Sequence, residues 1–391
     1  MSAAVRALAL LLAAVALLSC DPRRFDDLAA TTWLRRVDID QSQLNGDSGM
    51  RVADGAAGAQ GAIVLVAAEG GVASIPVAAD GEPGAQQDSA AGLFTGASLS
   101  ALAGDGAGRA YATTTTGTLF YFNTAAPATG AQAAVAVTSP GAGFGGQLVV
   151  GDLGVGGSTA DVVVTADQAV FVLEDETEPV RHCTYPTHKI LSAARGAPGE
   201  VFLGLDSSQV VTVALDFADG DPCTVSAPAD LSVLPMHLAS GYLDPGSVID
   251  VVAAQDGVAF QVVLNHLAQT LVRTEPAAAL AATGFGSSLV VADVDAAAAG
   301  DEVVVGSPGS TVDSIITAGR VDLYSFAAPD SFTWIAGLTV ASPEALENFG
   351  RSLAAPRYRN AQDQEKALLA VGGAREVYIY FLVASDDTDP R

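Results

Sequence analysis

The sequence is poor in positive charge, with 18 Lys plus Arg against 44 Asp plus Glu and a formal net charge of −26. Partners such as nucleic acid and anionic lipid head groups are bound through basic surface, so the composition argues against both. Histidine is also scarce: with four His residues, a multi-histidine metal centre has little to be built from. Charged residues are 16% of the chain, and half of the residues are apolar, which argues against disorder of the whole chain. The 41 Gly and 18 Pro indicate a folded, loop-rich, β-leaning chain.

The chain begins with a short apolar segment. Arg6 supplies a positive charge, and Ala7 to Leu18 follows with no polar side chain. This run is too short to span a bilayer as a helix, which needs about 20 residues. A charged start, a short apolar run and a small residue before the cut are typical of a secretory signal peptide.

The end of this segment, Leu17-Leu18-Ser19-Cys20, resembles the bacterial lipobox. The resemblance implies a lipoprotein signal peptide over residues 1–19 and lipidation of Cys20, which would anchor the protein to a membrane of a bacterial cell envelope. Residues 20–31 would form a solvated tether, and residues 385–391 an acidic tail. Ordinary cleavage after Ala14-Val15-Ala16 is the alternative. The identity of the membrane and the face on which the protein lies stay open.

Two further cysteines, Cys183 and Cys223, belong to a chain that would mature in an oxidising compartment. A disulfide between them is the expected pairing. The alternative is a metal site with the nearby His182 and His188. Two cysteines forty residues apart, with no C-x-x-C pair, are poor spacing for zinc.

The body of the chain repeats itself at intervals of roughly fifty residues. Each clear copy begins with a Phe-Gly pair, at Phe144-Gly145, Phe285-Gly286 and Phe349-Gly350. A short apolar strand, a loop of acidic or small residues, a β-branched strand, a Gly-rich turn and an alternating strand such as 321–324 follow. Alternation with period two predicts strands that are half buried in a stack of sheets.

The segment from Phe285-Gly286 to Gly306-Ser307-Pro308 resembles the FG-GAP repeat of integrin α-chain β-propellers and their bacterial relatives. The resemblance implies an all-β fold, a seven-bladed β-propeller of FG-GAP type repeats over residues 32–384. Seven blades lie within the range that propellers use around a central channel. A pair of β-sandwiches with chance Gly-Phe pairs is the alternative. The anchors of the seven repeats, each the residue before a second strand, are Ala62, Arg109, Asp161, Glu200, Asp250, Glu302 and Lys366.

Closure of the ring requires the first segment to pair with the last blade. Thr31–Asp38, which contains Trp33-Leu34, is the expected outer strand of that blade. Two insertions, Ser310–Thr317 and Asp330–Leu346, are expected to be long loops beside a partner site. Function in such folds lies on loops, because a closed ring gives them a rigid base.

In the family, the loop between the first two strands often binds calcium through D-x-D/N-x-D/N-G-x-x-D. The best copy here contains Asp293, Asp295 and Asp301, with Ala297 at the third position and one extra residue. Ca²⁺ needs six to eight oxygen ligands, so the loop is a degenerate candidate for Ca²⁺. The simpler interpretation is that these acids cap turns and keep the loops soluble. Asp152–Asp161 and Asp244–Asp250 bracket two related loops with still fewer ligands.

Two segments match catalytic motifs but lack the sequence surroundings that each motif requires. Gly46-Asp47-Ser48-Gly49 resembles a trypsin-like nucleophile segment, but the first histidine, His182, follows the serine when it should precede it. The G-x-G-x-x-G of residues 141–146 precedes an expected strand, whereas a dinucleotide site requires a helix.

The sequence therefore favours a non-catalytic binding or scaffold module, with a monomeric propeller domain and a protein or glycan of the envelope as its partner. A hydrolase or lyase acting on envelope polysaccharide, with acidic residues in the central channel, is the alternative. A purely structural spacer in a larger envelope complex shares every sequence feature with the first interpretation.

Overall fold

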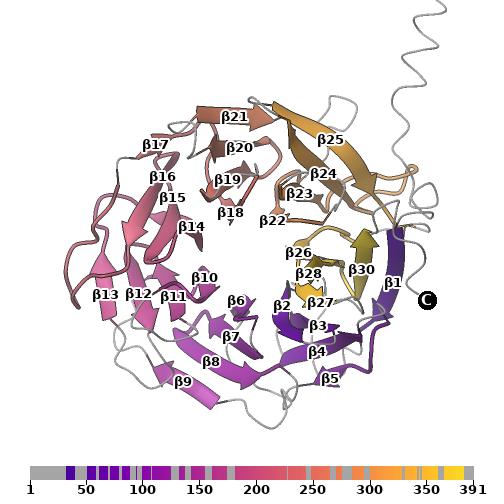
Figure 1. The fold of residues 1–391 in the computed structure, drawn as a ribbon, viewed down its shortest axis with the longest axis horizontal. Coiled ribbons are helices and arrows are strands. Elements are labelled where there is room, and N and C mark those ends of the chain that lie inside the picture. The colour runs from indigo at the N-terminus through magenta and orange to yellow at the C-terminus, as the bar shows by residue number, and fades with distance from the viewer. Residues whose placement is uncertain are drawn as a thin grey trace, which may run out of the picture.

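The computed structural model is a closed ring of seven four-stranded antiparallel sheets around a central axis (Figure 1). This confirms the prediction of an all-β, seven-bladed propeller. Among the described residues no helix is long and apolar enough to cross a membrane. The structure describes residues 32–39, 51–58, 61–68, 71–78, 82–88, 94, 99–106, 108–124, 132–136, 142–154, 161–173, 181–226, 228–243, 248–264, 270–274, 284–294, 300–327, 331–340, 343, 346–359 and 365–382.

Each blade contributes its strands in order from the axis outward, and the last blade is completed by the first strand of the chain. The strands are β2 (Arg51–Gly58), β3 (Gly61–Ala68), β4 (Gly71–Ala78) and β5 (Gln87–Asp88) in blade 1; β6 (Leu99–Gly104), β7 (Arg109–Thr114), β8 (Thr118–Asn123) and β9 (Gln132–Ala136) in blade 2; β10 (Leu148–Gly151), β11 (Asp161–Ala166), β12 (Ala169–Leu173) and β13 (Arg181–Thr184) in blade 3; β14 (Ile190–Arg195), β15 (Glu200–Leu205), β16 (Gln209–Ala214) and β17 (Ala229–Asp230) in blade 4; β18 (His237–Gly241), β19 (Asp250–Gln255), β20 (Ala259–Leu264) and β21 (Thr270–Thr274) in blade 5; β22 (Ser288–Ala292), β23 (Glu302–Ser307), β24 (Arg320–Ala327) and β25 (Ser331–Leu338) in blade 6; and β26 (Ser352–Ala354), β29 (Leu369–Gly372), β30 (Glu376–Leu382) and β1 (Thr32–Asp38) in blade 7.

The ring closes through the two ends of the chain. Strand β1 pairs antiparallel with β30 from Thr32↔Leu382 to Asp38↔Glu376. The prediction of an outer strand within residues 31–38 is therefore confirmed. Closure hides strand edges that would otherwise pair with other chains. The domain boundaries predicted beyond this ring, namely residues 1–19, 20–31 and 385–391, lie outside the described residues, as does Cys20.

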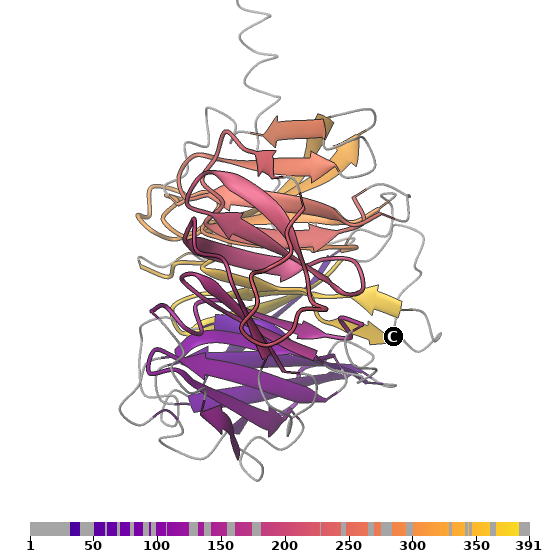
Figure 2. The ribbon, with the colours of Figure 1, turned by 90° about the vertical axis from the view of Figure 1, so that its left-hand side faces the viewer.

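Seven hydrophobic clusters hold the ring together, and each lies between two neighbouring blades. The second strand of a blade is therefore covered on both sides, and β11 and β23 are buried at every residue. This burial explains the continuous apolar runs, such as 162–164 and 303–305, that follow the first residue of these strands. Figure 2 shows the blades stacked side by side when the ring is viewed from its rim.

The Phe-Gly pairs stand just ahead of the first strand of a blade and anchor it to the blade before. Phe285 and Phe349 are fully buried, each against aromatic rings. Gly350 has φ +85°, and a side chain there would meet the backbone of Arg320 in the preceding blade. The Phe supplies buried area, and the Gly allows the close approach that a Cβ would block.

Three sequence expectations need correction. The seventh anchor, Lys366, lies in β28 (Glu365–Ala367), because a hairpin of β27 (Arg357–Arg359) and β28 is inserted ahead of β29. The first anchor, Ala62, is the second residue of β3, and the five anchors from Arg109 to Glu302 are the first residues of their strands rather than the residues before them. The expected loop 330–346 contains β25, the outer strand of blade 6. The insertion 310–317 is a loop, as expected.

Candidate functional site

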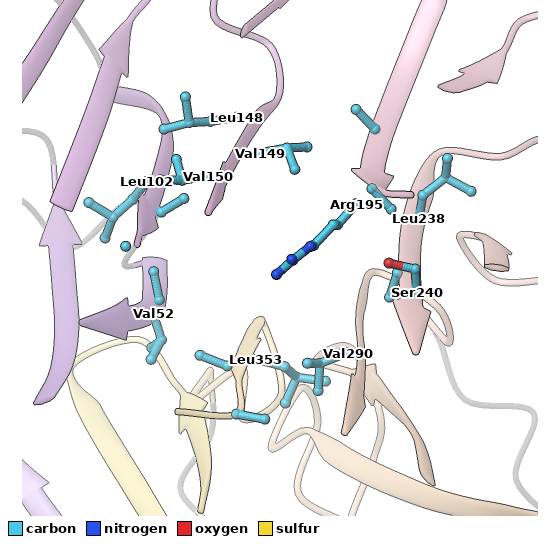
Figure 3. Close-up of a pocket in the computed structure, with 18 residues that line it drawn as sticks. Val52, Leu102, Leu148, Val149, Val150, Arg195, Leu238, Ser240, Val290 and Leu353 are labelled. Atoms are coloured by element: carbon cyan, nitrogen blue, oxygen red, sulfur yellow. The ribbon is translucent and has the colours of Figure 1, made fainter. Parts of the chain in front are cut away.

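The first strand of every blade begins on the same face of the ring, so each type of loop falls on one of two faces, which we call the AB face and the BC face. The AB face has the loops from first to second strand. The BC face has the loops from second to third strand and the connections between blades. The two faces enclose a central channel, which the first strands of all seven blades line (Figures 1 and 3).

The channel contains a cavity of about 300 Å³ with a largely aliphatic wall. Its 18 lining residues are Val, Leu, Ala and Gly except for Ser240 and Arg195. The hydrolase hypothesis placed acidic residues in this channel. Among the described residues, the wall of this cavity contains no carboxylate.

The candidate calcium loop lies on the AB face, and the structure describes part of it. Asp295 lies outside the described residues. The backbone N–H of Tyr242, in blade 5, donates to the Asp301 carboxylate over 2.6 Å, and the Asp301 N–H donates to the Tyr242 carbonyl over 2.8 Å. Asp301 thus joins blade 6 to blade 5. Burial raises the pKa of Asp301 above its ordinary value of 3.8, and hydrogen bonds from Tyr242 and Asp293 oppose that rise.

Neighbouring acids in these loops are buried as hydrogen-bond acceptors. Asp161 accepts the backbone N–H of Leu153 over 2.9 Å, and Glu302 accepts that of Val294 over 3.0 Å. Each acid opens a second strand and fixes the start of the loop that precedes it. Within the described residues, no group of three His, Cys, Asp or Glu side chains is arranged to hold a metal ion.

Cys183 and Cys223 form a disulfide. It joins β13 of blade 3 to the segment between β16 and β17 of blade 4, so the zinc alternative loses its thiolate ligands. All three histidines that the structure describes pair with aspartates: His182 with Asp219 at 2.6 Å, His188 with Asp206 at 3.3 Å, and His237 with Asp256 at 3.1 Å.

The BC face carries an exposed apolar surface on blades 5 and 6. Seven large apolar side chains in the described part of the chain are exposed, and four of them lie on this face: Met236, Val258, Ile316 and Leu346. Ile316 and Leu346 are 69% and 68% exposed, whereas the other five lie between 36% and 43%. Exposed aliphatic side chains are common singly, but adjacent ones of this exposure are typical of interaction surfaces.

Ile316 and Leu346 belong to two loops that are hydrogen-bonded to each other. We call these loops, residues 310–317 and 346–348, the paired loops. The N–H of Leu346 donates to the Ile316 carbonyl over 3.4 Å, and that of Asn348 to the Thr317 carbonyl over 3.0 Å. The Tyr378 hydroxyl donates to the Glu347 carboxylate and fixes the second loop to blade 7. The paired loops are therefore held by the ring rather than loose above it.

The paired loops also contain strained backbone. Six non-glycine residues in the described chain have positive φ, and five lie in these loops, including Leu346 at +67°. A left-handed conformation costs a non-glycine residue about 1–2 kcal/mol. Strain of this kind gathers at functional sites, where the surrounding structure maintains it.

The sequence located the first of the paired loops, but not the exposed side chains or the channel arginine. In the sequence, Ile316 lies among residues typical of a turn, and Arg195 is an ordinary residue at the end of a strand. Both become notable only when the ring brings distant segments together.

No protein-family model and no curated protein matches this chain. Solved structures similar to it include the WD40 domain of Toxoplasma gondii coronin, at 12% identity and a TM-score of 0.54, covering 92% of this chain and 88% of that one. Chaetomium thermophilum Raptor is also similar, at 10% identity and a TM-score of 0.56, covering 90% of this chain and 30% of that one. At this identity the likeness shows the β-propeller fold.

Proposed function

We propose that this chain is a non-catalytic binding or scaffold module whose BC face docks a protein of a bacterial cell envelope, to which Cys20 anchors it through lipid. The observation that carries the proposal is the pair Ile316 and Leu346, about two-thirds exposed on strained and braced loops. Burying such side chains against a partner yields roughly 25 cal/mol per Å² of apolar surface.

Several features support binding over catalysis. The wall of the channel is aliphatic, and the described histidines are engaged with exposed aspartates. The acids at the starts of β11 and β23 are buried acceptors for loop backbone. The Phe-Gly repeats support an FG-GAP type propeller, since each described pair anchors one blade to the next.

A protein partner is favoured over a glycan by the chemistry of the surface. Glycan sites present mainly hydrogen-bonding groups, whereas the most exposed large apolar side chains of the described chain, Ile316 and Leu346, lie on the paired loops. Apolar anchors surrounded by polar residues are typical of protein interfaces. Two exposed apolar side chains of blade 5, Met236 and Val258, lie on the same face of the ring.

The test is purification of the full-length protein from its own envelope in mild detergent, followed by mass spectrometry of the proteins that stay bound. The double variant Ile316→Asp/Leu346→Asp is compared with Val248→Asp, which changes an exposed apolar side chain on the AB face. We expect the double variant to lose a partner that wild type and Val248→Asp retain. Equal retention by all three proteins, or recovery of a glycan alone, would refute protein docking at the paired loops.

The anchor is tested separately. Lipidation of Cys20 predicts that metabolic labelling with a palmitate analogue marks the wild-type chain and that Cys20→Ala abolishes the label. Label that persists in Cys20→Ala would contradict lipidation at this residue.

A further inference from the structure

Arg195 is the one charged side chain among the described residues that line the cavity of the central channel. It ends β14, and its side chain points into the opening between the first strands (Figure 3). Around it stand Val149, Leu238 and the other aliphatic side chains of the wall. A pocket of mostly apolar wall with one well-placed polar group is the usual form of a small-molecule site, and about 300 Å³ is the lower end of the usual size range.

The guanidinium of Arg195 reaches into the opening of the channel (Figure 3). Its Nη2 donates to the Asp152 carbonyl over 2.7 Å, which fixes the side chain without neutralising it. A guanidinium has five N–H donors in a planar fork, and this fork matches a carboxylate. No carboxylate of the described lining competes for it.

The opposite end of the channel is also cationic. Arg51 opens β2 just ahead of the lining residue Val52, and Arg351 lies two residues ahead of the lining residue Leu353. Desolvation by the surrounding chain lowers the pKa of Arg51, and the charge of Arg351 lowers it further. In a chain of net charge −26, cations at both ends of one channel mark a region that attracts anions.

We propose that the central channel binds a small aliphatic monocarboxylate, with its carboxylate on Arg195 and its alkyl chain against the Val, Leu and Ala side chains of the inner strands. One guanidinium and one hydroxyl, that of Ser240, are the polar side chains of the cavity wall. This is enough to satisfy a single carboxylate, whereas a phosphate dianion would keep most of its charge uncompensated against aliphatic groups. The site is independent of the paired loops and of the proposed docking function.

The test is calorimetric titration of the full-length chain with hexanoate, with hexanol and acetate as matched probes. Hexanol keeps the alkyl chain without the charge, and acetate keeps the charge with almost no chain. We expect one hexanoate per chain, bound at least about tenfold more tightly than either probe, because charge-assisted hydrogen bonds and apolar burial both contribute. Equal affinity for hexanoate and hexanol would overturn the role of Arg195, and equal affinity for hexanoate and acetate would overturn the role of the wall.

Two charge variants identify the site. Arg195→Gln removes the cation from the channel, and Lys189→Gln removes one just ahead of the other end of the same strand, where Lys189 pairs with Asp167 at 3.1 Å. We expect Arg195→Gln to weaken hexanoate binding by about tenfold or more and Lys189→Gln to leave it unchanged. Arg195 is exposed and outside the hydrophobic clusters, so its variant should fold, which circular dichroism checks. Equal weakening in both variants, or no binding by wild type, would overturn the proposal.

Discussion

Arg320 and Asp322, two residues apart on β24, form an ion pair inside blade 6. The Nε of Arg320 donates to the Asp322 carboxylate over 2.8 Å, and Nη2 lies 2.7 Å from the same oxygen. Trp334 donates its indole N–H to that oxygen over 2.9 Å. Both charged side chains are almost completely buried. The alternation of residues 321–324 predicted a strand half buried in a stack of sheets. In the structure Asp322 is buried as well, because neighbouring blades cover both sides of the sheet.

We predict that Asp322→Ala destabilises the protein by about 3–5 kcal/mol, because it leaves the Arg320 charge buried without its partner. Replacing both residues, in Arg320→Met/Asp322→Leu, should cost less than the single change, since no charge stays behind. Urea unfolding followed by tryptophan fluorescence measures both variants. A single variant that is no less stable than the double variant would contradict this account of the pair.

The contrast between these residues and the repeat shows what the sequence could reveal. Phe285-Gly286 and Phe349-Gly350 were recognisable because a local motif performs a local task, in which Phe fills the gap between blades and Gly permits their approach. Phe94 performs the same packing in blade 2, against Phe120, but Thr95 separates it from the next glycine, so the motif was missed. The signal was a Phe shortly ahead of the strand that begins at Leu99.

The wall of the channel and the contact between the two paired loops were beyond such reasoning. Arg195 acquires its role from six other blades, and Leu346 meets Ile316 because the start of blade 7 lies beside a loop of blade 6. Both relationships depend on ring closure, which no short segment encodes. The burial of Asp322 was not visible in the sequence for the same reason, because neighbouring blades impose it.

The Cys183–Cys223 disulfide should stabilise the contact between blades 3 and 4. Backbone hydrogen bonds of 3.0 Å, from Thr184 to the Asp221 carbonyl and from Cys223 to the Thr184 carbonyl, accompany it. We predict that Cys183→Ala/Cys223→Ala lowers the free energy of unfolding by about 2–4 kcal/mol. Chemical denaturation measures the loss. Reductant should bring wild type to the level of the variant and leave the variant unchanged; a variant that still responds to reductant would point to another cause.

The buried acids at the starts of the second strands should stabilise the loops that precede these strands. Asp161→Ala removes the acceptor of the buried Leu153 N–H, so we predict a loss of about 1–3 kcal/mol. Asp152→Ala is the matched control at the other end of the same loop, because its carboxylate accepts the exposed Gly154 N–H over 3.1 Å. We expect the control to stay within about 0.5 kcal/mol of wild type. Equal losses in thermal or urea unfolding would show that loop composition, and not the buried acceptor, sets the stability.

The calcium hypothesis is tested most directly at Asp301. Its raised pKa means that the folded protein binds this proton more tightly than the unfolded chain, so the contribution of Asp301 to stability is largest at low pH and is lost as pH rises through the folded pKa. Asn keeps the acceptor for the Tyr242 N–H and removes the titrating charge. In calcium-free buffer at pH 7, Asp301→Asn should therefore be as stable as wild type or more stable, and its unfolding free energy should lack this component of the pH dependence.

If the loop of Asp293, Asp295 and Asp301 binds calcium, about 1 mM Ca²⁺ should raise the Tm of wild type, since extracellular calcium modules have dissociation constants of about 10⁻⁴–10⁻³ M. The rise should weaken as pH falls toward the pKa of Asp301, because Ca²⁺ competes with the proton. Asp301→Asn and Asp293→Asn should each abolish it. If Ca²⁺ does not raise the Tm of wild type at pH 7, the calcium hypothesis is wrong. The role of Asp301 is then its observed hydrogen bonding to Tyr242, which links blades 5 and 6.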